Sequence, residues 1–158
     1  MKNQFYALNL KGMRKKNLVK TQEEVERISK RWREAGKPPI DEKIKPLVVA
    51  LRVWGIKTTL SDEGHNAEGY HMRFPYVMFR WKYIVRVARI LMEWNYRTPK
   101  KIDDPNEVFW EIEPSANPLI RPLVRPGEPV PSLEAFQQDA VKLGLWLQHL
   151  PPDYKWTE

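Results

Sequence analysis

Hydrophobic residues recur at helical spacing in four segments of this chain. Within each segment the apolar side chains fall three, four or seven positions apart, the spacing that gives a helix one buried face. The first segment follows a T-x-x-E capping box at Thr21 and ends at Gly36, before two prolines, which are typical helix stop signals. Together these patterns predict helices at residues 22–35, 43–54, 82–97 and 133–149.

Alternation of apolar and polar residues predicts β-strands in the remaining sequence. Residues 56–61 alternate with a period of two, and residues 70–79 are rich in β-forming side chains, so the two segments should pair as an antiparallel hairpin. A third strand is predicted at about residues 107–113. The prolines of the segment 114–131 exclude a central strand there, although Leu119–Val124 fits an edge strand or an extended cover.

These elements predict a single α+β domain over residues 1–158, in which about four helices cover a small antiparallel sheet. Residues 1–20 form a basic segment that is compatible with an extended conformation, and residues 114–131 form a Pro-rich loop. Most of the seven tryptophans should lie in the core because of their large apolar rings. The residues expected to be mostly buried are Leu51, Trp54, Ile56, Leu60, Val87, Leu91, Trp110, Ile112, Phe136 and Leu143.

The composition narrows the class of protein. A chain of 158 residues, of which 42% are hydrophobic, can bury a sufficient core without disulfides or a structural metal. The absence of cysteine excludes a disulfide framework, a cysteine-ligated metal site and a cysteine nucleophile. The chain has no run of about 18 apolar residues and no signal-peptide pattern, so we expect a soluble, cytoplasmic protein without a membrane partner. It also lacks the P-loop, G-x-G-x-x-G and G-x-S-x-G motifs.

The charge is unevenly distributed along the chain. Residues 1–57 contain 15 Lys and Arg against 6 Asp and Glu, whereas residues 102–158 contain 4 against 10. A basic N-terminal half can bind nucleic acid by neutralising phosphates, and the aromatic and basic residues from Arg80 to Arg86 suit base stacking. The alternatives are that the basic half pairs with the acidic C-terminal third, and that Arg and Lys cover an aromatic ring of the protein itself.

The polar loop between the two hairpin strands holds the main candidate site. Asp62, Glu63 and His65 lie within four positions, directly after a strand that ends at Ser61. Carboxylates beside an imidazole suit proton transfer, so these three are candidate catalytic residues. In the alternative interpretation, Asp62 forms an ordinary Asx-turn and His65 caps a turn.

The return strand brings further polar side chains toward this loop. His71 opens the strand and is expected to face the loop across the hairpin, and Ser61, His71 and Arg73 are candidate ligand-binding residues. Two histidines and a carboxylate, His65, His71 and Asp62, are also a usable ligand set for zinc, manganese or iron. No H-x-x-x-H, H-E-x-x-H or D-x-D motif accompanies them, so the sequence assigns no cofactor.

The segment around the loop resembles a known motif. Residues 55–65, GIKTTLSDEGH, resemble the pattern G-I-x-T-x-x-S-C-x-G-H of small uncharacterised bacterial and phage proteins, in which an apolar helix precedes the motif and a β-strand follows it. The resemblance covers about residues 46–79. Asp62 stands at the position of the motif's cysteine, so a thiol role does not carry over. The resemblance implies the helix–strand–loop order and no specific activity.

Two functions fit these observations. The first is a small domain that binds a small polar or anionic ligand at the hairpin of residues 58–73, extended to catalysis if His65, Glu63 and Asp62 act on that ligand. The second is a nucleic-acid or protein-interaction module that acts through the basic N-terminal half. The first requires the loop carboxylates and both imidazoles to converge on one cleft, whereas the second requires a continuous basic surface. The sequence does not specify the oligomeric state.

Overall fold

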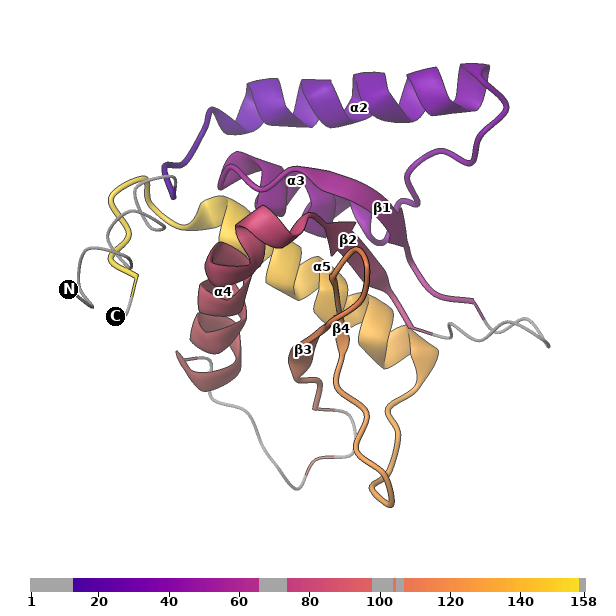
Figure 1. The fold of residues 1–158 in the computed structure, drawn as a ribbon, viewed down its shortest axis with the longest axis vertical. Coiled ribbons are helices and arrows are strands. Elements are labelled where there is room, and N and C mark those ends of the chain that lie inside the picture. The colour runs from indigo at the N-terminus through magenta and orange to yellow at the C-terminus, as the bar shows by residue number, and fades with distance from the viewer. Residues whose placement is uncertain (1–12, 66–73, 98–103, 105–106, 157–158) are drawn as a thin grey trace.

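The computed structural model describes residues 13–65, 74–97, 104 and 107–156. These residues form helices around an antiparallel sheet, which confirms the predicted α+β class (Figure 1). Along the chain the elements are α2 (Leu18–Glu34), α3 (Lys45–Val53), β1 (Thr58–Asp62), β2 (Tyr76–Phe79), the 3₁₀ turn η1 (Trp81–Tyr83), α4 (Ile84–Arg97), β3 (Trp110–Glu113), β4 (Leu119–Pro122) and α5 (Leu133–His149). No helix in the described part of the chain is both long and apolar enough to cross a membrane.

Within the described residues the sheet has four antiparallel strands in the order β1-β2-β4-β3. The predicted hairpin is confirmed in β1 and β2, where Ser61 lies opposite Val77. Val77 in turn lies opposite Ile120 of β4, and Ile120 lies opposite Ile112 of β3. Val77 and Ile120 are fully buried, so this face of the sheet forms part of the hydrophobic core.

The position of β4 corrects the prediction that prolines exclude a central strand. β4 pairs with β2 on one side and with β3 on the other, so it is an inner strand. Pro118 precedes the strand and Pro122 is its last residue, so the amides between them remain available for the ladder. Pro118 also contributes through its carbonyl oxygen, which accepts a hydrogen bond from the Phe79 amide at 3.0 Å. A proline is therefore compatible with an inner strand as short as this one.

The first described helix begins one turn earlier than the capping box indicates. α2 starts at Leu18, and its N-cap is Asn17, whose side chain accepts a hydrogen bond from the Lys20 amide at 3.0 Å. Thr21 lies inside the helix, where its hydroxyl donates to the Asn17 carbonyl oxygen. Asn is at least as favourable an N-cap as Thr. Thr21 is buried one turn before the buried Val25, so the buried face of the helix extends toward the N-terminus, beyond the capping box.

The core lies where α5 runs along α3 and behind the sheet (Figure 1). Gly144 of α5 faces the backbone of Pro46, which lets the two helices approach closely. The Trp54 indole donates to the Leu147 carbonyl oxygen at 2.8 Å, and the Gln148 side chain donates to the Pro46 carbonyl oxygen at 2.7 Å. These two hydrogen bonds join both ends of α3 to α5, Pro46 at its start and Trp54 directly after it. They therefore fix the position of α3 relative to α5.

Most of the predicted core residues are buried, and Leu60 is the exception. Leu60 is 48% exposed. A register irregularity between Thr58 and Leu60 places Leu60 opposite Met78, while Thr58 lies opposite the buried Phe79. The alternation of the sequence therefore predicts the strand but not the side to which Leu60 turns. Ile112 is partly buried against the core, and the remaining predicted residues are buried: Leu51, Trp54, Ile56, Val87, Leu91, Trp110, Phe136 and Leu143.

Candidate functional site

Two carboxylates and one imidazole come together beside the end of β1. Asp62 is the last residue of β1, His65 follows three positions later, and Asp41 lies in the segment between α2 and α3. One potential ligand atom from each of these residues lies within 4.8 Å of the other two. The structure thus brings two predicted site residues together with Asp41, which was not among the predicted site residues.

Backbone amides of the loop hold both carboxylates in place. The Glu63 amide donates to Asp41 Oδ2 at 3.2 Å, and the Gly64 amide donates to Asp62 Oδ1 at 2.7 Å. His65 Nε2 lies 3.2 Å from the same Asp62 oxygen. In each carboxylate, the hydrogen bond to one oxygen fixes the orientation of the group. The second oxygen accepts no hydrogen bond from the described residues and can serve as a ligand atom.

A buried glutamine of α5, Gln137, is hydrogen-bonded to the backbone of the loop. Gln137 Nε2 donates to the carbonyl oxygens of Glu63 at 3.0 Å and Gly64 at 3.4 Å, and Gln137 Oε1 accepts from Lys43 Nζ at 3.0 Å. Only 8% of Gln137 is exposed, so this polar side chain has its hydrogen bonds satisfied inside the protein. No local sequence pattern could reveal this role, because Glu63 and Gln137 are 74 positions apart.

The other predicted site residues take different positions. Glu63 is outside the three-residue cluster, and its carboxylate accepts a hydrogen bond from the Lys43 amide at 3.1 Å, which ties the loop to the segment before α3. Ser61 is part of the β1–β2 ladder. His71 and Arg73 lie outside the described residues, so their approach to the loop stays a prediction.

The charge around the cluster is predominantly negative. Burial raises the pKa of Asp41, and the carboxylates of Glu63 and Asp62 add to this effect, while the Glu63 amide and His65 oppose it. Burial also raises the pKa of Tyr76, which lies opposite Asp62 in the sheet, and the charges of Asp62 and Asp41 contribute. The pKa values of Asp41 and Tyr76, on separate segments, are thus both raised in part by the negative charge of Asp62. A bound cation would neutralise this charge.

Asp41→Asn should raise the melting temperature of the protein at neutral pH in a buffer that contains a chelator. Because the pKa of Asp41 is raised in the folded protein, the folded state holds this proton more tightly than the unfolded chain, so stability is lost as the pH rises and the group ionises. Asparagine removes the charge and keeps an oxygen that can accept the Glu63 amide. Thermal melts between about pH 3 and pH 8 should show a difference that vanishes at the acid end. A lower melting temperature at neutral pH would contradict this expectation.

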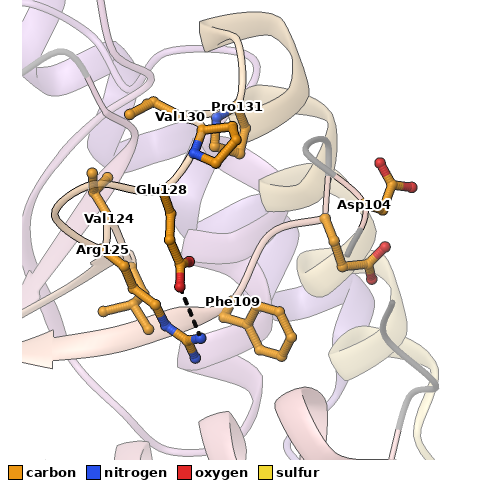
Figure 2. Close-up of a pocket in the computed structure, with 10 residues that line it drawn as sticks. Asp104, Phe109, Val124, Arg125, Glu128, Val130 and Pro131 are labelled. Atoms are coloured by element: carbon orange, nitrogen blue, oxygen red, sulfur yellow. Dashed lines mark ion pairs between the residues drawn. The ribbon is translucent and has the colours of Figure 1, made fainter. Parts of the chain in front are cut away.

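Two cavities lie elsewhere in the structure. One, of about 510 Å³, is lined by Asp104, Glu107 and Phe109 on one side and by the loop 123–131 on the other (Figure 2). The other, of about 460 Å³, lies against the first turns of α5 and shares Asp104 and Glu107 with the first. None of the described loop residues, which end at His65, lines either of them, so neither cavity is the cleft expected around Asp62, Glu63 and His65.

The aromatic and basic residues before and within α4 make contacts inside the protein. Lys82 Nζ lies 5.0 Å and the Arg86 guanidinium carbon 5.6 Å from the centre of the Tyr83 ring. These are the contacts expected when cations cover an aromatic side chain of the same protein. The Trp81 indole is 48% exposed and donates to the Ser115 carbonyl oxygen at 3.0 Å. These contacts agree with the alternative that Lys and Arg cover an aromatic ring of the protein itself. Binding of nucleic acid by this segment stays a prediction.

Comparisons with known proteins leave the function to be argued from the side chains. No protein-family model, no curated protein and no solved structure matches the chain. The geometry of the described residues is therefore the basis for any functional assignment.

Proposed function

We propose that the protein binds a divalent metal ion of the zinc or manganese type through Asp41, Asp62 and His65. The observation that carries this proposal is the meeting of three potential ligand atoms within 4.8 Å of one another. Carboxylate oxygens and an imidazole nitrogen form a mixed ligand set that such metals accept. Bonds of about 2.0–2.2 Å around a tetrahedral zinc place its ligand atoms roughly 3.3 Å apart, so modest side-chain rotations complete the site.

The surroundings of the cluster favour a cation. Three carboxylates, those of Asp41, Asp62 and Glu63, lie near a single imidazole, and the raised pKa of Asp41 reflects its burial and this repulsion. A divalent ion would neutralise two of these negative charges. Backbone amides already orient the Asp41 and Asp62 carboxylates, so binding costs less side-chain ordering than it would for free side chains.

A metal would also provide a way for an acidic loop to bind a small polar or anionic ligand. Three protein ligands leave at least one coordination position open, and in catalytic zinc sites that position takes water or a substrate atom. The His65 side chain is 51% exposed, so the cluster is accessible from solvent. The bound ion would then supply the positive charge that attracts the ligand.

Isothermal titration calorimetry of the chelator-treated protein, with Zn²⁺ and separately with Mn²⁺, tests the proposal. We expect about one bound ion per chain. Asp62→Asn and His65→Ala each remove a ligand, so each should weaken binding by more than the roughly 10–100-fold that is typical of changes outside the ligand set. Binding should also weaken in acid, because the ligands must lose their protons to hold the ion.

His149→Ala and Asp153→Asn are the matched controls for these variants. Both residues are exposed, and His149 Nδ1 is hydrogen-bonded to the Leu145 carbonyl oxygen of its own helix. Both variants should bind the metal as the wild type does. If Asp62→Asn binds as tightly as Asp153→Asn, the ion is held elsewhere and the proposed site is wrong.

A further inference from the structure

The fold sorts the charges of α2, a helix that carries both signs in its sequence. Glu24 Oε1 accepts a 2.9 Å hydrogen bond from Arg52 Nη1, and Glu26 Oε1 lies 3.0 Å from Lys45 Nζ. Both basic partners belong to α3, along which α2 packs (Figure 1). Two of the four glutamates of α2 are therefore neutralised by basic residues of α3.

The basic residues of α2 remain on the solvent side of the helix. Glu34 Oε1 lies 3.9 Å from Lys30 Nζ, and both side chains are mostly exposed, so this ion pair contributes little. Glu23 is the one glutamate of α2 that has no ion pair within the described residues. The exposed basic residues of α2 that also have no ion pair there are Lys20, Arg27, Arg31 and Arg33. The unneutralised charge of the helix is therefore positive.

Three of these basic residues lie in line along one side of α2. Lys20, Arg27 and Arg31 are seven and four positions apart, which is close to whole turns of a helix with 3.6 residues per turn. The buried residues Val25 and Ser29 lie on the side that packs against the protein. With a rise of about 1.5 Å per residue, the cationic stripe of Lys20, Arg27 and Arg31 is about 16 Å long, or about five base-pair steps of a duplex.

The surroundings of the cationic stripe favour a duplex over other polyanions. Single-stranded nucleic acids are usually held by aromatic side chains on which the bases stack. The one aromatic residue of α2, Trp32, packs against the hydrophobic core. A helix that lies in a membrane surface needs a free apolar face, but Val25 and Ile28 of α2 pack within the protein. A duplex requires neither feature, because contacts between cations and its phosphates are sufficient for binding.

We propose that the cationic stripe of α2 binds the phosphate backbone of duplex DNA without sequence specificity. Arginine forms paired hydrogen bonds with phosphate oxygens, so Arg27 and Arg31 would hold neighbouring phosphates. Lys20 would add a further contact near the N-terminal end of the helix. Contacts of this kind position a protein on DNA and do not read its bases. The proposal is independent of the metal site at the hairpin loop.

Fluorescence anisotropy of the full chain with a labelled duplex DNA of about 24 base pairs, in a buffer that contains EDTA, tests this proposal. We expect a Kd of roughly 10 µM or lower at about 50 mM salt. The logarithm of Kd should rise with the logarithm of the salt concentration with a slope of at least about 2.7, which is about 0.9 for each of three phosphates. No binding up to about 100 µM protein would overturn the proposal. Equal or tighter binding of a single strand of the same length, or of phosphatidylglycerol vesicles, would also overturn it.

The double variant Arg27→Gln/Arg31→Gln should lower the salt slope by about 1.8 and weaken binding at about 50 mM salt by about fivefold or more. Arg27→Lys/Arg31→Lys keeps both charges, so it should keep the slope. Lys142→Gln/Lys155→Gln is the matched control, because it removes the same charge from exposed positions outside α2, and it should bind as the wild type does. Asp62→Asn should also bind DNA normally, which separates this proposal from the metal site. Equal losses in the two glutamine variants would show that the overall charge attracts the DNA, and would contradict the assignment to α2.

Discussion

Gly64→Ala should lower the free energy of unfolding by about 3 kcal/mol, and it should weaken metal binding at the hairpin loop. Gly64 has a φ of +84°, which costs an alanine roughly 1–2 kcal/mol. A Cβ at this position would lie 2.7 Å from Leu133 Cδ1 and 3.0 Å from backbone atoms of Phe74 and Pro75, so the loop must also shift. Because the Gly64 amide orients Asp62, that shift should disturb the cluster. Urea unfolding and zinc titration measure the two effects.

Gly127→Ala is the matched control for the loop variant. Gly127 has a similar φ of +79°, but a Cβ there would meet nothing within 4 Å. It should therefore cost only the roughly 1–2 kcal/mol of the unfavourable backbone conformation, and it should leave metal affinity unchanged. Equal losses of stability in the two variants would show that the close approach at Gly64 has no energetic consequence.

Gly144→Ala should destabilise the protein by about 2–3 kcal/mol, although alanine is the better helix former. A Cβ at Gly144 would lie 2.5 Å from the Pro46 carbonyl carbon and 2.6 Å from the Leu47 amide nitrogen. Backbone atoms cannot move aside as a flexible side chain can, so α5 must separate from α3. That separation would strain the hydrogen bond from Trp54 to the Leu147 carbonyl oxygen. The gain in helix propensity, about 1 kcal/mol, offsets only part of the cost.

Gln138→Ala on the same helix gives the comparison for helix propensity alone. Gln138 is exposed, and its side chain donates a 3.3 Å hydrogen bond to Glu134 one turn earlier. Its replacement should change the unfolding free energy by no more than about 0.5 kcal/mol. Chemical denaturation of Gly144→Ala and Gln138→Ala measures the two changes in the free energy of unfolding. A Gly144→Ala protein as stable as the wild type would mean that α3 and α5 can separate without loss.

The charge of the sequence and the charge around the hairpin-loop cluster differ in sign. A net charge of +7 favours anions at long range, and the basic N-terminal half suggested phosphate contacts. The described geometry instead gathers the carboxylates of Asp41, Asp62 and Glu63 around His65. Net charge acts over the whole surface, whereas binding in a site depends on the few charges that line it. The overall charge balance could therefore not predict the local negative charge around His65.

Part of the candidate site could be predicted from the sequence. Asp62 and His65 are three positions apart on a loop after a predicted strand, and in the structure His65 Nε2 lies 3.2 Å from Asp62 Oδ1. Asp41 could not be predicted as their partner, because nothing in the segment before α3 shows that it reaches the end of β1. The hydrogen bond from the Glu63 amide to Asp41 spans 22 positions of the chain.

Elements that have local causes could be predicted from the sequence, whereas the contacts between these elements depend on the packing of the folded chain. Helical spacing, alternation and capping residues act within a few positions, so they predicted the described helices, the β1–β2 hairpin and most of the core. The inner position of β4, the outward turn of Leu60 and the support of the loop by Gln137 are contacts between distant segments. The packing of the whole chain determines such contacts, because each arises only after the elements on both sides of it have found their places.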